Sequence, residues 1–182
     1  MNAGRISVRY AKALFDLANA ENSAKAVYEH SNAVSQIISS PEFFHILHNP
    51  VIPPSQKEII INGILVGNVH PLLNSFILLM VKKRREAHIV NALLVFQKIY
   101  RENAGLVKVV IETPAELEEE TKNNILDFVK RKFKKTPELE VRQKPSLIGG
   151  FVVEVEGLLI DLSISGQLAK VKKALVQNQK VL

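Results

Sequence analysis

The sequence predicts an α+β protein of two domains, in which an N-terminal six-helix bundle precedes a small α/β domain with the element order β-α-β-β-β-α. Two observations lead to this fold class. Apolar residues recur at helical spacing up to about residue 104, whereas alternating and β-branched runs follow Gly105. The chain has 182 residues, which is enough for one large domain or two small ones. We expect the domains to span residues 1–104 and 105–182.

Six helices are expected in the first domain, and the short connections between them favour an antiparallel bundle. Three of these helices begin at or directly after a proline, a residue that lacks an N–H and therefore loses no hydrogen bond in the first helical turn. Gly105 lies just past the last helix, where glycine commonly caps a helix end. The predicted helices cover residues 4–20, 23–38, 41–48, 53–65, 72–83 and 86–102.

The second domain is expected to begin with a strand over residues 106–111 and a helix that ends near residue 134. The start of this helix is assigned to residues 113–116, because Thr113 and Glu116 have the spacing of a capping box and Pro114 occupies the first helical position.

Three further strands and a helix complete the predicted second domain. The strands cover residues 139–144, 149–156 and 158–162, and Gly157 lies at the turn of a hairpin between the last two. The final helix is expected over residues 166–177. Its apolar spacing predicts three buried side chains, those of Leu168, Val171 and Leu175.

Composition excludes several classes of protein. Cysteine is absent, so disulfides, thiol nucleophiles and cysteine-bound metals are excluded. The net charge of +6 is divided between residues 1–104, with +4, and residues 105–182, with +2, so neither part is a basic tail. The longest apolar run is shorter than the roughly 18–20 residues of a membrane-spanning helix, and the N-terminus does not have the pattern of a secretion signal.

No constellation of residues predicts catalysis, a metal or a cofactor. Glu42, His45 and His48 share a short helix, but their spacing does not bring three ligands together. No phosphate-binding glycine loop is present. Asp161 follows an apolar strand residue, which is more typical of a turn or cap than of an acid catalyst. We therefore predict no catalytic, metal-binding or cofactor-binding residue.

The first and fifth predicted helices have wider apolar faces than one core contact requires. One interpretation is that the fifth helix is the buried centre of the bundle. The other is that both helices leave an apolar groove for a partner helix. The residues predicted to line this groove are Tyr10, Ala13, Leu14, Phe76 and Leu79.

Two basic runs, over residues 82–85 and 130–135, leave a nucleic-acid-binding module as an alternative function. Each run is predicted at the C-terminus of a helix, where cations also stabilise the helix dipole. Nucleic-acid recognition on a sheet favours aromatic side chains that stack on bases, and the predicted strands offer only Phe151. The charge distribution therefore favours solvated helix ends over a nucleic-acid site.

Segments at both ends of the chain resemble one protein family, the delta subunits of ATP synthase, whose mitochondrial relative is the oligomycin-sensitivity-conferring protein. The N-terminal segment is Arg9-Tyr10-Ala11-Lys12-Ala13-Leu14-Phe15-Asp16-Leu17-Ala18. The C-terminal segments are Pro145-Ser146-Leu147-Ile148-Gly149-Gly150-Phe151-Val152-Val153, then Ile160-Asp161-Leu162-Ser163, then Gly166-Gln167-Leu168. Leu162 and Gln167 depart from the residues that the family commonly has there.

The resemblance implies a non-catalytic stator subunit that joins the catalytic head of the enzyme to its peripheral stalk. It implies that the N-terminal helix of an alpha subunit binds between the first and fifth helices, at positions that include Tyr10 and Leu79. It also implies that the second domain holds the end of the b-subunit stalk, with no cofactor and no nucleic acid. The expected location is peripheral, on the cytoplasmic face of a bacterial plasma membrane.

Glycine chemistry gives Gly149 and Gly150 a structural role, because glycine alone adopts positive φ freely and lets another backbone segment approach closely. We expect the pair to open a strand and, with Asp161, to shape the second domain without any catalytic role.

Overall fold

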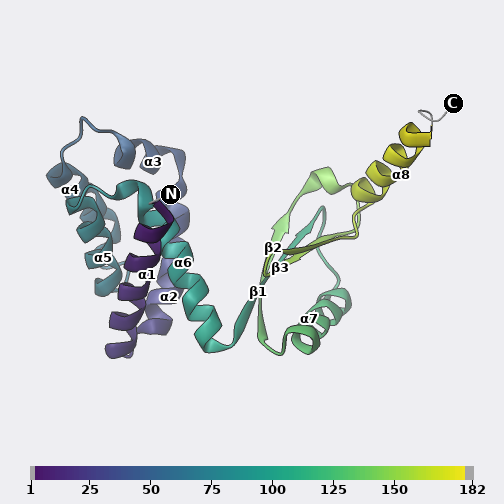
Figure 1. The fold of residues 1–182 in the computed structure, drawn as a ribbon, viewed down its shortest axis with the longest axis horizontal. Coiled ribbons are helices and arrows are strands. Elements are labelled where there is room, and N and C mark those ends of the chain that lie inside the picture. The colour runs from purple at the N-terminus through teal and green to yellow at the C-terminus, as the bar shows by residue number, and fades with distance from the viewer. Residues whose placement is uncertain (1–2, 179–182) are drawn as a thin grey trace. The chain divides into compact units, whose positions relative to one another are not determined.

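The computed structural model describes residues 3–178 and confirms the α+β class (Figure 1). The chain divides into two compact units, Met1–Asn103 and Ala104–Leu182. The division coincides with the change from helical to alternating apolar spacing. Each unit has a hydrophobic core of its own.

The first unit consists of helices. In chain order they are α1 (Ala3–Ala20), α2 (Ala24–Ser39), α3 (Pro41–His48), α4 (Pro54–Leu65), α5 (Pro71–Lys82), the 3-10 helix η1 (Glu86–His88) and α6 (Ile89–Ala104). Every one of the six α-helices contributes buried side chains to one apolar core. The three helices predicted to start at prolines do start there, and Gly105, with φ +65°, follows the end of α6 as predicted.

One charged pair lies inside the first unit. The ammonium group of Lys57 on α4 donates hydrogen bonds to the carbonyl oxygen of Leu47 at 2.6 Å and to the carboxylate of Glu86 at 3.0 Å. The side chains of Lys57 and Glu86 are only 6% and 12% exposed. The pair therefore connects α4 with the C-terminal end of α3 and with η1.

The second unit is a four-stranded mixed sheet with two α-helices. Its elements are β1 (Leu106–Thr113), α7 (Glu119–Phe133), β2 (Thr136–Gln143), the 3-10 helix η2 (Pro145–Leu147), β3 (Val152–Val155), β4 (Leu158–Asp161) and α8 (Ile164–Asn178). The strand order is β2-β1-β3-β4, with β1 parallel to β2 and the other pairs antiparallel. The helix α7 makes the crossover that a parallel pair requires.

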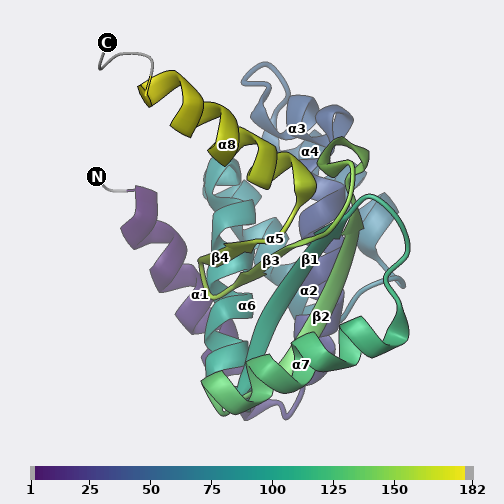
Figure 2. The same ribbon diagram turned by 90° about the vertical axis from the view of Figure 1, so that its right-hand side faces the viewer.

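The two faces of this sheet differ in character. The face toward α7 carries the buried core, which includes Val109, Ile111 and Val129, and Figure 2 shows α7 passing across β1 and β2. The opposite face carries ions: Lys108 and Arg142 contact the Glu140 carboxylate at 2.6 and 2.7 Å. Burial raises the pKa of Glu140, but these hydrogen bonds and charges outweigh it and hold the pKa below its ordinary value.

The predicted capping box at residues 113–116 is wrong. Thr113 is the last residue of β1, and its hydroxyl donates to the carbonyl oxygen of Ala115 at 2.8 Å instead of accepting from a helical N–H. The helix α7 begins only at Glu119, with no side-chain cap. Pairing of Thr113 with β2 extends the strand through the residue that local sequence would use as a cap.

Strand and helix limits in the second unit also differ from the predictions. β2 begins at Thr136 rather than residue 139, because it pairs with the full length of β1. β3 begins at Val152, so Gly149 and Gly150 lie before the strand and do not open it. Leu168, predicted to be buried, is 57% exposed because α8 projects from the sheet and packs beside η2 (Figure 1). The side chains of Val171 and Leu175 lie outside the described residues.

Candidate partner-binding surfaces

Two neighbouring helices of the first unit meet at an apolar surface. Tyr10 on α1 contacts Phe76 on α5, with ring centroids 6.4 Å apart and the rings nearly perpendicular. Tyr10, Ala13 and Leu17 recur at three- and four-residue spacing and so share one side of α1. On α5, Leu79 lies three residues after Phe76 and shares its side. The contact between Tyr10 and Phe76 places the apolar side of α1 beside that of α5.

The predicted groove residues divide into surface and core. Leu79 is 44% exposed, Ala13 is exposed and Tyr10 is half-buried. Leu14 and Phe76 are 1% and 7% exposed and belong to the core, which corrects the expectation that they line an open groove. Most of α5 is buried, as the first interpretation of its wide apolar face requires, but Leu79 is not.

Leu17 on α1 is not among the residues predicted to line the groove. It is 52% exposed, which makes it the most exposed large apolar side chain of α1. Its position one turn after Ala13 was the available signal. We define the α1–α5 strip as Tyr10, Ala13, Leu17 and Leu79.

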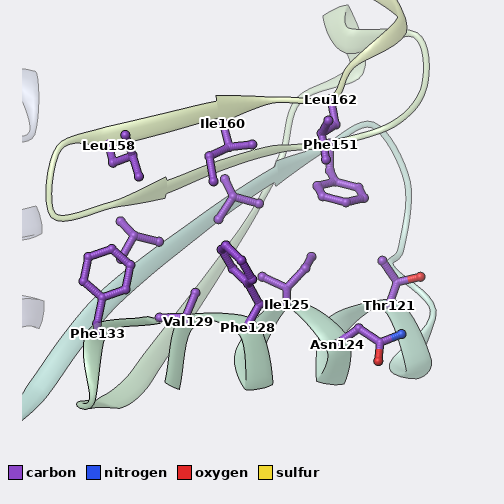
Figure 3. A pocket seen from close by; sticks show the side chains of 12 residues that line it. Thr121, Asn124, Ile125, Phe128, Val129, Phe133, Phe151, Leu158, Ile160 and Leu162 are labelled. Atoms are coloured by element: carbon purple, nitrogen blue, oxygen red, sulfur yellow. The ribbon is translucent and has the colours of Figure 1, made fainter. Parts of the chain in front are cut away.

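The second unit contains an apolar cleft that sequence analysis missed. It has a volume of about 350 Å³ and lies between α7 and the β3–β4 hairpin (Figure 3). Phe128 points into it from α7, and Leu158 and Ile160 face it from β4. Phe128 and Leu158 are 46% and 44% exposed. The remaining lining residues are Thr121, Asn124, Ile125, Val129, Phe133, Phe151, Val153, Val155 and Leu162.

The cleft exists because the hairpin is wider than the helix that covers it. The α7 side chains Ile125 and Val129 fill the space over β1 and β3, where the core lies. β4 is the edge strand of the sheet, so its inward-facing residues lack a second helix above them. The consecutive apolar residues of β4 were visible in the sequence, but the absence of a covering helix was not.

Gly149 and Gly150 lie against the segment that connects β4 to α8. Gly150 has φ +71°, and a Cβ atom there would overlap the backbone carbonyl oxygen of Leu162. The N–H of Ile164 donates to the carbonyl oxygen of Gly149 at 3.0 Å. The glycine pair thus permits the close backbone approach for which glycine was expected, although outside a strand.

Asp161 organises the same segment through hydrogen bonds. Its carboxylate accepts from the N–H of Ser163 at 2.9 Å and from the Ser163 hydroxyl at 2.6 Å. The Ser163 oxygen in turn accepts from the N–H of Gly166 at 3.0 Å in the first turn of α8. The two hydrogen bonds from Ser163 lower the pKa of Asp161. Asp161 therefore has the contacts of a turn residue.

The histidines of α3 are engaged in local contacts. The His48 ring stacks on Phe44 with centroids 3.9 Å apart, and its Nδ1 lies 2.9 Å from the Phe44 carbonyl oxygen. Because a carbonyl can only accept, Nδ1 carries the proton. Among residues 3–178, no three His, Asp or Glu side chains are grouped closely enough to hold a metal ion.

Comparison with known proteins identifies the family. A family model described as ATP synthase delta (OSCP) subunit matches residues 6–175. The chain belongs to the ATP synthase delta (OSCP) subunit family. The role predicted from the sequence, a non-catalytic stator subunit of ATP synthase, is confirmed by this membership. None of the helices in the described part of the chain combines the length and apolar character needed to cross a bilayer.

Individual members of the delta (OSCP) family match over nearly the whole chain. The ATP synthase delta subunit of Symbiobacterium thermophilum is 31% identical over 96% of this chain and 94% of its own. That of Phocaeicola vulgatus is 30% identical over all of both chains. A chain in the cryo-EM structure of the Toxoplasma gondii mitochondrial ATP synthase hexamer has the same fold, with a TM-score of 0.69, 19% identity, and coverage of 93% of this chain and 97% of that one.

Proposed function

We propose that this subunit connects the catalytic head of ATP synthase to the end of the peripheral stalk, with one binding surface on each unit. The six helices of the first unit act as a bundle that binds the N-terminal helix of an alpha subunit on the α1–α5 strip. The second unit binds the end of the b-subunit stalk. The complex holds the protein at the cytoplasmic face of a bacterial plasma membrane. The observation that carries the proposal is the exposure of Leu17 and Leu79 on adjoining helices.

The geometry of the α1–α5 strip suits an amphipathic helix. Such helices bind through apolar anchors spaced by one and two turns, and they lie along a surface made by neighbouring elements. Tyr10, Ala13 and Leu17 repeat along α1 with that spacing, and Leu79 adds an anchor from α5. Leu14 and Phe76 lie beneath the strip and hold its two helices at a fixed separation. They support the surface without contacting the partner.

The cleft of the second unit is the best candidate for the stalk. Phe128, Leu158 and Leu162 are each between 44% and 51% exposed around it, so a bound apolar side chain would remove water from three large residues. The basic residues of the 130–135 run follow Phe128 at and just beyond the C-terminal end of α7, and they favour an acidic flank on the partner. The Asp161 turn and the two glycines fix the hairpin that forms one wall.

The mechanism needs no bond making. A stator transmits force when both of its ends bind tightly and the part between them resists deformation. The head is then unable to rotate with the rotor, so that proton flow does work on the nucleotide sites. The buried Lys57–Glu86 pair and the paired strands supply stiffness within each unit.

Nucleic acid binding has little support in the arrangement of the second unit. Phe151, the aromatic residue that the sequence predicted on a strand, lies directly before β3 and lines the cleft that faces α7. On the opposite face Lys108 and Arg142 pair with the carboxylate of Glu140, and Lys144 pairs with that of Glu112. These cations are therefore already engaged by carboxylates that a phosphate would have to displace.

Two adjacent residues of β4 provide a matched test of stalk binding. Leu158 lines the cleft, whereas Leu159 points to the other side of the strand and is 62% exposed. In the full chain, Leu158→Asp should abolish capture by the b subunit and Leu159→Asp should leave it intact. Equal capture by both variants, with unchanged circular dichroism, would remove the cleft from the proposal.

Function is tested by removal and replacement of the subunit. Membranes stripped of it should lose ATP-driven proton pumping while the released head retains ATP hydrolysis, and the purified chain should restore pumping. Pumping that survives without the subunit would refute the stator role. Loss of hydrolysis by the released head would point instead to a contribution to catalysis.

A further inference from the structure

We propose that Arg9 and Arg85 form a carboxylate-binding site at one end of the α1–α5 strip, and that this site binds an acidic side chain of the bound helix. The inference rests on the proposed function of the strip and specifies the partner: an amphipathic helix that carries a Glu or Asp beside its apolar anchors. The site would set the direction and register of that helix.

Tyr10 joins the two arginines to the strip. Arg85 Nη1 donates to the Tyr10 hydroxyl at 3.2 Å, and the guanidinium carbon of Arg85 lies 5.4 Å from the centre of the ring. The guanidinium carbon of Arg9 lies 5.7 Å from the same centre. The same ring also makes an edge-to-face contact with Phe76. The Tyr10 side chain is therefore part of the apolar strip and also contacts both arginines.

The two cations come from separate segments of the chain and face one hollow. Arg9 lies in the first half of α1, and Arg85 lies between α5 and η1. Arg5, Ile6, Arg9 and Arg85 together line the hollow. A neighbouring hollow on α1 adds Lys12 to the same basic region.

No carboxylate in the described part of the first unit neutralises this region. Among the described residues, none lies within 4.0 Å of the guanidinium nitrogens of Arg5, Arg9 or Arg85. Glu86 follows Arg85 directly, but it points inward to Lys57 at 3.0 Å and is 12% exposed. The buried pair thus uses the carboxylate that could otherwise have paired with Arg85.

Arginine chemistry favours a carboxylate as the missing partner. A guanidinium group donates two parallel hydrogen bonds to a carboxylate, and such charge-assisted bonds are stronger than neutral ones. Like charges in one hollow repel each other unless an anion lies between them. Since the hollow continues into an apolar strip, a side chain on an amphipathic helix meets both requirements, whereas a free phosphate would leave the strip uncovered.

The test is calorimetric titration of the full chain with a peptide of the alpha-subunit N-terminal helix from the same complex. Arg9→Gln and Arg85→Gln should each weaken binding by about ten-fold, the effect of losing a charge-assisted hydrogen bond. Lys98→Gln is the matched control, because it removes one positive charge from an exposed site on α6. It should leave the affinity unchanged, and all three variants should keep the wild-type melting temperature.

Peptides in which each acidic residue is replaced in turn by its amide identify the bound carboxylate. The peptide that lacks the bound carboxylate should bind the wild-type chain more weakly, by the same factor that Arg85→Gln weakens binding of the unaltered peptide. The same peptide should bind the Arg85→Gln chain no more weakly than the unaltered peptide does. Additive losses would overturn the proposal. Unchanged affinity of both arginine variants would overturn it too, and if Leu79→Asp still abolished binding, the function of the strip would stand.

Two further results separate this site from other anions and from failure of the proposed function. Vesicles containing phosphatidylglycerol should bind the wild type and Arg85→Gln equally. If Arg85→Gln weakens vesicle binding but not peptide binding, the site belongs to a membrane surface and the proposal is refuted. A wild-type chain that binds no alpha-subunit peptide would refute both the site and the proposed function of the strip.

Discussion

Leu79→Asp tests the α1–α5 strip, because Leu79 is exposed in the free subunit and should be covered in the complex. Leu79 is 44% exposed. Fully burying a Leu side chain contributes about 1.5–3 kcal/mol, so covering the exposed fraction contributes roughly 0.7–1.3 kcal/mol to binding. A carboxylate in the same place must also lose its water. The total loss is on the order of 2–5 kcal/mol, or about 30-fold to several thousand-fold in Kd.

The assay is calorimetric titration of the full chain with the alpha-subunit N-terminal peptide, accompanied by urea unfolding. Ile59→Asp is the control, since Ile59 is 71% exposed on α4 and lies outside the strip. It should bind like the wild type. Leu79→Asp should keep the unfolding free energy within about 1 kcal/mol of wild type, because exposed substitutions change stability little.

Two outcomes would refute the reasoning about Leu79. Unchanged affinity with an intact fold would show that the strip is not the binding surface. Unfolding of the first unit by Leu79→Asp would show that α5 is buried all round in solution. Phe76→Asp gives the reference for that second outcome, because Phe76 is 7% exposed and its replacement should unfold the unit.

Three further predictions concern stability. Gly150→Val should destabilise the second unit, because the positive φ alone costs a side chain about 1–2 kcal/mol and the new Cβ would also overlap the Leu162 carbonyl oxygen. Urea unfolding measures this loss, and a wild-type free energy of unfolding would show that the glycine is dispensable. Lys57→Met should lower the free energy of unfolding of the first unit by about 3–5 kcal/mol, because it leaves the Glu86 carboxylate buried and unpaired. A decrease below about 1 kcal/mol in the same urea assay would contradict this prediction. Because the pKa of Asp161 is lowered in the folded state, its stabilising contribution is present above pH 3.8 and is lost as the pH falls through the lowered value. Unfolding of Asp161→Asn at pH values above and below 3.8 should therefore show a shallower acid dependence than wild type, and equal slopes would refute this.

The helices of the first unit could be predicted from sequence because their signals are local. Pro41 and Pro54 fix helix starts through a missing N–H, and Gly105 fixes an end through its freedom at positive φ. The apolar period of α1 and α5 is likewise a property of a few consecutive turns. These features act within about four residues, so they do not depend on what the rest of the chain does.

The sequence was informative but incomplete about the candidate surfaces. It indicated that α1 and α5 have more apolar side chains than a core needs, and it selected Tyr10 and Leu79. Yet Leu14 and Leu79 look alike in an apolar period, while one is 1% and the other 44% exposed. Which side of a wide arc is covered depends on the positions of the neighbouring helices.

Tertiary structure alone decided the remaining features. Thr113 has the local signature of a helix cap, but pairing with β2 extends β1 through it, because a ladder of hydrogen bonds along eight residues outweighs one capping bond. The cleft at Leu158 exists because β4 is an edge strand, and the arginine pair exists because Arg85 lies beside Tyr10, 75 residues away. Sequence by itself determined where the chain bends and which faces are apolar, since those preferences are local. Contacts between distant residues decided which faces stay open, because burial depends on what packs against them.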